Sequence, residues 1–223
     1  MIKENLKKVE DEIKQICQTS NISYPITPVI VTKYVDIDKI KKVIEAGHRE
    51  LAENKVQVAE KKIIELKNEK VKWHFIGHLQ RNKVKKAVYL FDCIQSADSL
   101  PLLKELNKAC ETLKKYPEIF IQLNIGEEEQ KFGFTIDSFV KNEKEIFSFQ
   151  NLNIIGMMVV IPYLTDERSI SVMYKKATCF FQKMSLNHSK LSQLSMGMSH
   201  DFQIAIKEGA TMVRIGQAIF NEN

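Results

Sequence analysis

The sequence predicts an α/β fold, a single (β/α)8 TIM barrel, on three observations. Eight short, apolar, β-branched runs recur along the 223 residues, and charged stretches of helical pattern separate them. No linker rich in proline or serine divides the chain, so we expect one domain over residues 1–223. An open, doubly wound sheet is the alternative, but it usually has fewer strands, and no G-x-G-x-x-G follows the first run.

The expected elements follow from the same alternation. An amphipathic, charged segment predicts an N-terminal helix at about 2–20, ahead of the first strand. A helix over 36–46 is bounded by the capping residue Asp36 and by Gly47, and a helix over 199–208 starts at Ser199 in the same way. The eight strands are expected at 29–32, 50–52, 73–76, 90–94, 119–124, 154–159, 191–195 and 211–215.

Composition and charge exclude several classes of protein. With 44% hydrophobic and 27% charged residues the chain resembles an ordinary globular protein, not a disordered or fibrous one. Lysines alternate with glutamates along the expected helices, which favours solvated surfaces over a nucleic-acid interface. No apolar run is long enough to span a membrane, and the N-terminus lacks the apolar core of a signal peptide. The four cysteines are widely spaced without a C-x-x-C pair, so we expect reduced thiols and a cytoplasmic location.

Functional groups of such a barrel are expected where the strands end at their carboxyl side. Polar, small or flexible residues stand directly after the apolar runs, which implies a pocket at this rim. They are Lys33, Asn54, Gly77, His78, Ser96, Asn124, Met158, Ser195, Ser199, Arg214 and Gly216.

Lys33 directly follows the first apolar run. A lysine that is partly desolvated at the rim has a lowered pKa and can form an imine with an aldehyde. The alternative is a strand-end lysine that simply reaches solvent, which is common in a chain with this much lysine.

The segments after the seventh and eighth strands are typical of a phosphate site. The first contains Ser195, Gly197 and Ser199 ahead of a helix, and the second contains Arg214 and Gly216. Turn glycines and capping serines would explain each of the two segments alone. They explain less well why such residues occur in both segments where a phosphate site is expected. The five histidines form no metal-binding pattern, so no metal site is expected.

Three motifs then resemble a known family. Residues 73–83 are close to W-H-F-I-G-x-L-Q-x-N-K, residues 194–201 to L-S-M-G-M-S-x-D, and residues 209–220 to G-x-T-x-V-R-I-G-x-A-I-F. Together they resemble the pyridoxal phosphate homeostasis protein family, and the match runs in order along nearly the whole chain. The resemblance implies a barrel like the N-terminal domain of alanine racemase that binds pyridoxal 5′-phosphate (PLP).

The resemblance also implies roles for individual residues. Lys33 would hold PLP as a Schiff base, and no catalytic residue is implied. The cofactor-binding residues would be Lys33 at the aldehyde, Ser195, Ser199 and Gly216 at the phosphate, Arg214 near the pyridine nitrogen, and Asn54 and Met158 beside the ring.

The function that the resemblance implies is PLP (vitamin B6) homeostasis by a carrier without an established reaction. PLP-dependent apo-enzymes are the expected partners, and a monomer without membrane or nucleic-acid contacts is expected. One alternative is a weak amino-acid racemase whose second base comes from Tyr34 or a partner chain. The chain ends just after the eighth run, which leaves no room for a racemase's second domain. The other alternative is a phosphate-ligand barrel that binds nucleic acid.

Overall fold

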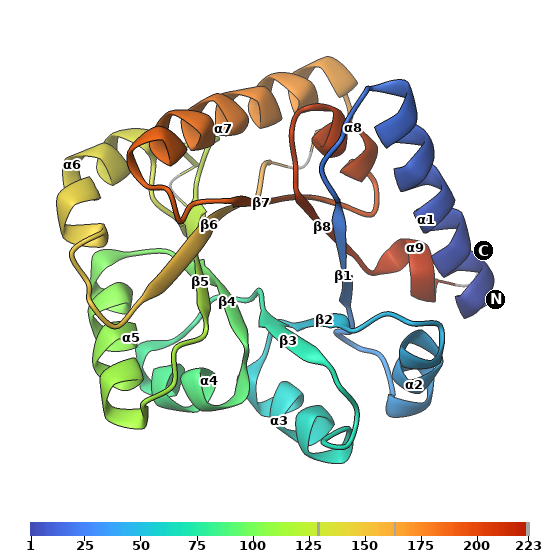
Figure 1. Ribbon diagram of the computed structural model, residues 1–223, viewed down its shortest axis with the longest axis horizontal. Coiled ribbons are helices and arrows are strands. Elements are labelled where there is room, and N and C mark those ends of the chain that lie inside the picture. Colours follow the sequence, from blue (N-terminus) through green and yellow to red (C-terminus); the bar gives the residue numbers. More distant parts are fainter. Residues whose placement is uncertain (129, 163, 222–223) are drawn as a thin grey trace.

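Eight parallel strands close into a barrel in chain order, as a computed structural model of the protein shows (Figure 1). The structure describes residues 1–128, 130–162 and 164–221, so residues 222–223 of the expected domain lie outside the described residues. Pairing of the first strand with the last closes the sheet, with Val29 beside Arg214. The strands are β1 (Thr27–Val31), β2 (Glu50–Glu53), β3 (Lys72–Phe75), β4 (Cys93–Ala97), β5 (Glu118–Leu123), β6 (Asn153–Val159), β7 (Gln193–Met198) and β8 (Met212–Ile215).

The helices form a ring around the barrel (Figure 1). The N-terminal helix α1 packs against α2, α8 and α9 beside the seam where β8 meets β1, so the first and last helices of the described chain lie side by side there. The helices are α1 (Ile2–Thr19), α2 (Ile37–Glu45), α3 (Val56–Glu65), α4 (Val84–Leu90), α5 (Leu100–Leu113), α6 (Ile136–Ile146), α7 (Glu167–Asn187), α8 (Phe202–Lys207) and α9 (Gln217–Phe220), with a 3-10 turn, η1 (Arg81–Lys83), before α4.

The predicted barrel is confirmed, and the open-sheet alternative is wrong. Two strand predictions are displaced along the chain. The expected strand at 90–94 begins at Cys93 because Leu90 still belongs to α4. The expected strand at 191–195 continues to Met198, with an irregular register against β8 after Ser195. This shift moves Ser195 from the rim into the middle of a strand.

Local capping chemistry sets the start of some helices as predicted. The Asp36 carboxylate accepts a hydrogen bond from the backbone N–H of Lys39 at 2.8 Å, and Gly47 follows the helix with a φ of +99°. The predicted start of the later helix at Ser199 is wrong. That helix begins at Phe202, because Ser199 belongs to the turn between β7 and α8.

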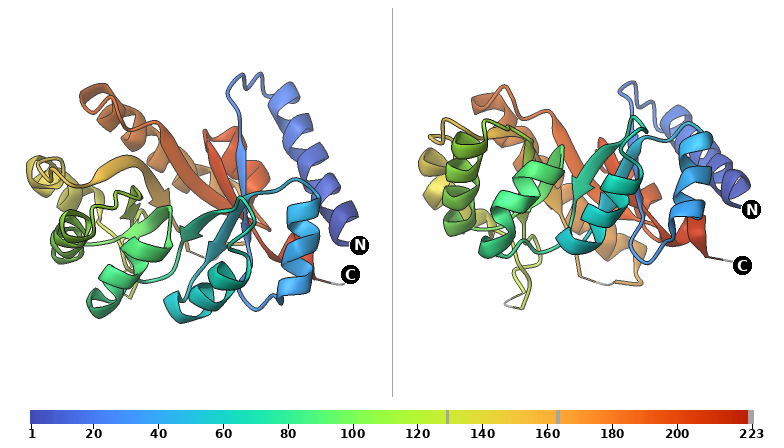
Figure 2. Two further views of the ribbon diagram at one scale, coloured as in Figure 1. Left: turned by 60° about the horizontal axis from the view of Figure 1, so that its bottom comes forward. Right: turned by 90° about the horizontal axis from the view of Figure 1, so that it is seen from below.

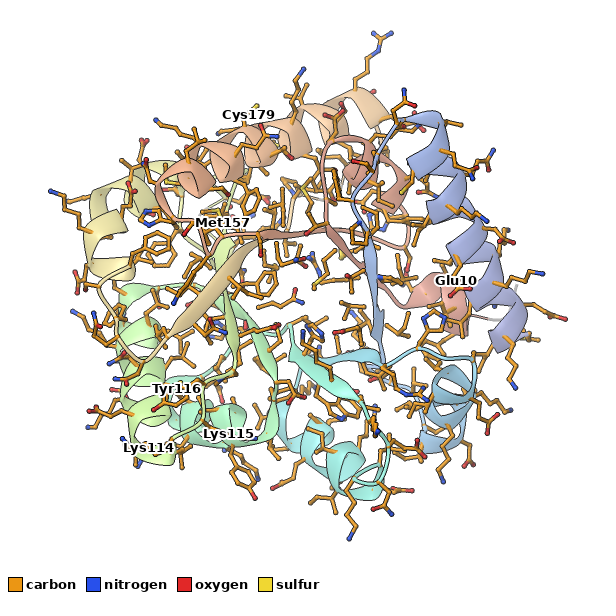
Figure 3. The ribbon with its side chains drawn as sticks, viewed as in Figure 1. Glu10, Lys114, Lys115, Tyr116, Met157 and Cys179 are labelled. Carbon is orange, nitrogen blue, oxygen red and sulfur yellow. The ribbon has the colours of Figure 1, made fainter. Side chains whose placement is uncertain are left out.

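Apolar side chains pack on both sides of the sheet. The larger cluster lies between the strands and the surrounding helices, and a smaller one fills the barrel interior. Figure 3 shows the interior occupied by side chains, while charged side chains point outward from the helices. The barrel is therefore a packed core and not a pore. The interior cluster consists of Val29, Val31, Ala52, Cys93, Phe120, Met158 and Met212.

The connections at the carboxyl ends of the strands gather on one side of the barrel. Figure 2 shows the segments that follow β5 and β6 extending from that same side. Among the described residues, no helix combines the length and apolarity that crossing a membrane requires.

Candidate functional site

A cavity of about 320 Å³ opens at the carboxyl ends of β1, β7 and β8. We call it the Lys33 cavity. It brings together an amine, a guanidinium and a hydroxyl group from three separate segments of the chain. The residues that matter to its chemistry are Val31, Lys33, Met198, Ser199, Arg214 and Gly216.

Arg214 is buried at the base of this cavity and is held by three hydrogen bonds. Its Nη1 donates to the backbone carbonyl of Ser195 at 2.9 Å and to the Ser195 hydroxyl at 2.8 Å. Its Nη2 donates to the carbonyl of Val159 at 2.9 Å. Burial lowers the pKa of this guanidinium, although the charge of Asp201 opposes that change. The result is a fixed cation beneath the ligand space.

The turn that carries Ser199 is anchored by a buried carboxylate. Asp201 accepts a hydrogen bond from the backbone N–H of Met198 at 2.6 Å, and it accepts a second from the hydroxyl of Tyr174 in α7 at 2.9 Å. Burial and the neighbouring Asp201 carboxylate raise the pKa of Tyr174, so this hydroxyl keeps its proton. Gly197 has a φ of +89°, and a Cβ there would lie 2.5 Å from the Cβ of Ala205. Only glycine fits the turn.

Ser199 faces the start of α9 across the cavity. Its hydroxyl oxygen accepts hydrogen bonds from the backbone N–H groups of Gly216 at 3.1 Å and Ala218 at 3.3 Å. A Cβ on Gly216 would lie 3.2 Å from the carbonyl oxygen of Val31, so a side chain here would crowd β1. Because the Ser199 oxygen is occupied by two N–H groups, the hydrogen of its hydroxyl is left to donate to an anion.

Lys33 also lines the cavity, from the turn after β1, and its side chain is exposed. The partial desolvation that we expected of Lys33 is therefore not found, because its side chain is open to solvent. The preceding residue is nevertheless firmly held. The carbonyl of Thr32 accepts a hydrogen bond from the buried ammonium of Lys62 at 2.8 Å, and the Thr32 hydroxyl donates to Glu53 at 2.9 Å. Lys62 also pairs with Glu53 at 2.6 Å, which completes the support beneath Lys33.

Three predicted site residues lie outside the wall of the Lys33 cavity. Ser195 is fully buried within β7, where its hydroxyl contacts Arg214. Met158 is 1% exposed and belongs to the interior apolar cluster. Asn54 lines a different cavity, next to the loop after β3. The structure thus places Lys33, Ser199, Arg214 and Gly216 on one cavity. Ser195 lies directly behind Arg214, and Met158 and Asn54 lie elsewhere.

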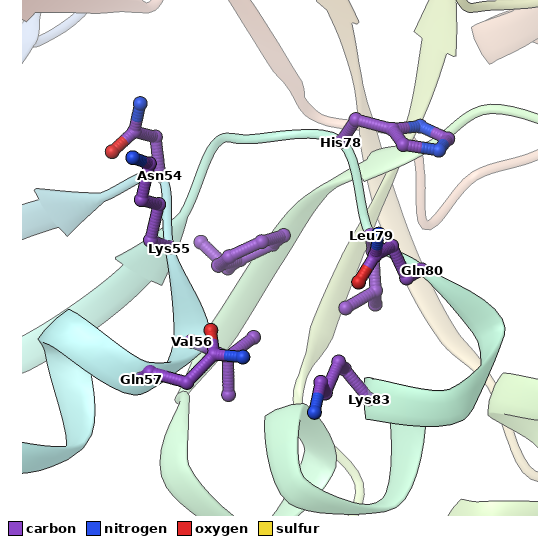
Figure 4. Close-up of a pocket in the computed structure, with 9 residues that line it drawn as sticks. Asn54, Lys55, Val56, Gln57, His78, Leu79, Gln80 and Lys83 are labelled. Atoms are coloured by element: carbon purple, nitrogen blue, oxygen red, sulfur yellow. The ribbon is translucent and has the colours of Figure 1, made fainter.

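We call that second hollow, of about 380 Å³, the Asn54 cavity. Figure 4 shows Asn54, Lys55 and Gln57 on one side, with Gln80 and Lys83 facing them from the connection between β3 and α4. The cavity also includes Phe75. Among the described residues, neither lysine forms an ion pair.

Gly77 allows the close packing between these two loops. A Cβ on Gly77 would lie 2.1 Å from the backbone carbonyl oxygen of Asn54. His78 follows it, and its ring stacks on Phe132 with 3.6 Å between centroids while Nδ1 contacts Asp98 at 2.9 Å. His78 thus lines the Asn54 cavity.

One polar side chain inside the barrel, that of Gln95, was missed from the sequence. Gln95 is fully buried in β4, and so is the predicted rim residue Ser96. The hydroxyl of Ser96 has no hydrogen-bond partner among the described residues. The signal that could have found Gln95 is a glutamine two residues after Cys93, which places both on the same face of the strand. Within the described part of the chain, no group of three His, Cys, Asp or Glu residues could hold a metal ion.

Comparison with known proteins gives a consistent picture along the whole chain. A family profile described as the alanine racemase N-terminal domain matches residues 5–223. The pyridoxal phosphate homeostasis protein of Aquifex aeolicus (strain VF5) is 33% identical over 225 residues, covering 98% of this chain and 97% of the relative. The protein of the same name from Synechocystis sp. is 37% identical over 199 residues, covering 87% and 90%.

A solved structure shares both the fold and part of the sequence. PipY of Synechococcus elongatus PCC7942, determined with PLP bound, superposes with a TM-score of 0.87 at 28% sequence identity. The match covers 99% of this chain and 100% of PipY.

Proposed function

The chain belongs to the pyridoxal phosphate homeostasis protein family, on the fold of the alanine racemase N-terminal domain, and from this membership we propose that it binds PLP in the Lys33 cavity and serves PLP homeostasis. The observation that carries the proposal is the convergence of Lys33, Arg214 and Ser199 on one cavity. These residue types match the three functional parts of the cofactor: an aldehyde, a pyridine nitrogen and a phosphate.

Lys33 is the proposed point of attachment. When bound, PLP supplies an aldehyde carbon with which a lysine amine forms a carbon–nitrogen double bond, releasing water. The exposed amine of Lys33 is accessible to such a group, while Glu53 and Lys62 hold the backbone just before it. The amine is therefore flexible at its tip and fixed at its base.

Ser199 and Gly216 are the proposed phosphate-binding residues. The Ser199 oxygen accepts two backbone N–H bonds, so its own hydrogen remains available to donate to a phosphate oxygen. We propose Ser199 for this role in place of Ser195, whose hydroxyl is already engaged below the cavity by Arg214 and Gln95.

Arg214 is the proposed neighbour of the ring nitrogen. A guanidinium only donates hydrogen bonds and stays protonated, so it favours an unprotonated nitrogen opposite it. An unprotonated pyridine is a weaker electron sink. This supports a carrier that catalyses no reaction of its own, and the free thiols of Cys93 and Cys110 support residence in the reducing cytoplasm. We propose a monomer that exchanges PLP with PLP-dependent apo-enzymes.

Visible absorbance of the purified protein after incubation with PLP tests the binding site. We expect a yellow protein whose band disappears in Lys33→Ala. The matched control Lys55→Ala, which alters an exposed lysine of the Asn54 cavity, should keep the band. A native protein that stays colourless, or a band that survives in Lys33→Ala, would contradict the proposed site.

Solvent deuterium exchange separates the carrier from a weak racemase. The alternative enzyme would use a second base, for which the 87% exposed Tyr34 beside Lys33 is the available candidate. We expect no deuterium at Cα of alanine or serine incubated with the PLP-loaded protein in D2O. Incorporation that is lost in Tyr34→Phe would establish the enzyme instead.

A further inference from the structure

A chain of polar side chains crosses the barrel interior below the Lys33 cavity. It starts at Arg214 in β8 and ends at Glu50, the first residue of β2. Ser195, Gln95 and His74 connect them, and each of these three is fully buried. Uncharged polar groups are costly to bury unless they are hydrogen-bonded, so the connections among them are the point of interest.

Each member of the chain is within hydrogen-bond distance of the next. Arg214 Nη1 lies 2.8 Å from the Ser195 oxygen, which lies 2.7 Å from Gln95 Oε1. Gln95 Nε2 lies 3.0 Å from His74 Nδ1. His74 Nε2 in turn contacts the Glu50 carboxylate. This series of hydrogen bonds is continuous from the buried Arg214 cation to the Glu50 carboxylate at the opposite end of the barrel.

The direction of every hydrogen bond follows from the chemistry of the two ends. Arg214 can only donate, so the Ser195 oxygen accepts, and its own hydrogen points to Gln95 Oε1. The Gln95 amide nitrogen then faces His74 Nδ1, which must accept. The ring proton therefore sits on Nε2 and is donated to Glu50. All donors point the same way, from the guanidinium toward the carboxylate.

Gln95 is the residue that sets this direction. Its carbonyl oxygen is used by Ser195, and its amide nitrogen is used by both His74 Nδ1 and the sulfur of Met212 at 3.1 Å. A flipped amide would face Nδ1 with an oxygen and would deprive the Ser195 hydrogen of its acceptor. A buried donor without an acceptor is expensive, so the flipped state is disfavoured.

We propose that Gln95 is a positioning residue for the PLP site, because it orients the Ser195 hydroxyl that holds Arg214. This inference rests on the proposed function and deepens it, because it names a residue that supports Arg214, the proposed neighbour of the pyridine nitrogen. Gln95 does not touch the Lys33 cavity, so it acts only through Ser195. His74, which accepts through Nδ1, keeps Gln95 in the required orientation.

Charged groups surround the lower end of the chain and act on His74. Glu50 in β2 bonds directly to it, Lys72 precedes it in β3, and Glu118 in β5 pairs with Lys72 at 2.8 Å. Cys93 of β4 lies beside His74 in the sheet register. Burial raises the pKa of Glu50, but the hydrogen bond from His74 and the charge of Lys72 outweigh burial, so the net shift is downward. An ionised Glu50 keeps the His74 proton on Nε2.

A double-mutant cycle with Gln95→Met and Ser195→Ala tests this assignment in the protein loaded with PLP. Because Gln95 acts through Ser195, we expect each single variant to weaken PLP binding about tenfold, the loss of one buried hydrogen bond to a charged group. The double variant should bind PLP no more weakly than either single variant does. The dissociation constant is measured by titrating the visible absorbance.

A second readout needs no cofactor. The chain has four arginines, so the side-chain N–H signals of PLP-free protein can be assigned by NMR with single Arg→Lys variants. We expect the Arg214 signal to exchange with solvent faster in Gln95→Met, while those of Arg49, Arg81 and Arg168 are unchanged. If Gln95→Met does not fold, Ser195→Ala breaks the same link and should show both effects alone.

Three outcomes would overturn the assignment. Additive losses in the double variant would show that Gln95 does not act through Ser195. An unchanged dissociation constant with a lowered melting temperature would reduce Gln95 to a structural role. An unchanged Arg214 signal would break the link to the arginine. Failure of the proposed function is distinct, since the native protein itself would then take up no PLP.

Discussion

The two cavities at the rim of the barrel have similar sizes and different support. The Lys33 cavity measures about 320 Å³ and the Asn54 cavity about 380 Å³, and each contains lysine. Around the Lys33 cavity, Arg214 and Asp201 are buried and hydrogen-bonded to neighbouring strands and helices. Around the Asn54 cavity, Lys55 and Gln80 are exposed.

The difference shows what makes a rim position into a binding site. A lysine alone is a poor indicator in a chain with 33 lysines and arginines. A ligand that binds flexible side chains must offset the entropy of ordering them, whereas a cavity with fixed donors avoids most of that cost. The support behind the side chains therefore distinguishes the Lys33 cavity from the Asn54 cavity.

The largest effect on folding is expected from removing the support below Lys33. Lys62→Met leaves the buried Glu53 carboxylate without its cation, and breaking such a pair costs about 3 kcal/mol of unfolding free energy. Urea denaturation measures the loss. The matched control Lys83→Met alters a lysine of the Asn54 cavity that forms no ion pair with any described residue, and it should change stability by less than about 0.5 kcal/mol. Equal losses in the two variants would erase the contrast between the cavities.

A direct effect on binding is expected at the phosphate end. Ser199→Ala removes the acceptor for the N–H groups of Gly216 and Ala218 and one donor to the ligand, so PLP should bind about tenfold more weakly. Absorbance titration gives the dissociation constant of PLP for the native protein and for Ser199→Ala. Gln80→Ala in the Asn54 cavity serves as the control and should bind PLP like the native protein. If Gln80→Ala were the weaker binder, the phosphate would belong to the other cavity.

A smaller effect is expected one step behind the site. Tyr174→Phe removes one hydrogen bond to Asp201 but leaves the bond from the Met198 N–H, so the loss in stability should be about 1 kcal/mol. Thermal unfolding of the variant measures it. Tyr116→Phe, at a tyrosine that is 50% exposed, should leave the melting temperature unchanged. A Tyr174→Phe protein as stable as the native one would show that Asp201 does not depend on α7.

The smallest effect concerns the pH dependence of stability that Glu50 contributes, at the end of the polar series inside the barrel. The pKa of Glu50 is lowered in the folded protein, so its ionisation stabilises the fold above the ordinary value of about 4.3 and stops doing so as pH falls through the lowered value. The stability difference between the native protein and Glu50→Gln should therefore be present at pH 7 and shrink below about pH 4. Urea midpoints at several pH values measure it, with the surface variant Glu65→Gln as control. A difference that grows toward acid pH would have the wrong sign.

Much of the architecture could be predicted because it depends on local patterns. The alternation of apolar runs with helical stretches indicates the barrel, and Asp36 marks a helix start through its own side chain. The sequence placed Ser195 at the rim because the apolar run ends there. The strand continues to Met198, however, because its pairing with β8 resumes there, with Met198 beside Arg214.

The parts that could not be predicted depend on contacts between distant segments. Gln95 and Ser195 are 100 residues apart and meet only because the barrel closes. Asn54 follows β2 as expected, but the close approach of Gly77 brings it next to the β3 loop instead of the Lys33 cavity. Family resemblance names residues of this kind, and only the assembled fold shows which of them touch.

Borohydride reduction of the PLP-loaded protein, followed by peptide mapping, tests the central claim most directly. Reduction fixes the bond between cofactor and lysine, and the mapped peptide identifies the amine. We predict that the modified residue is Lys33 and that Lys55 and Lys83 remain unmodified at one equivalent of PLP. A label on Lys55 or Lys83 would place the cofactor in the Asn54 cavity and contradict the account.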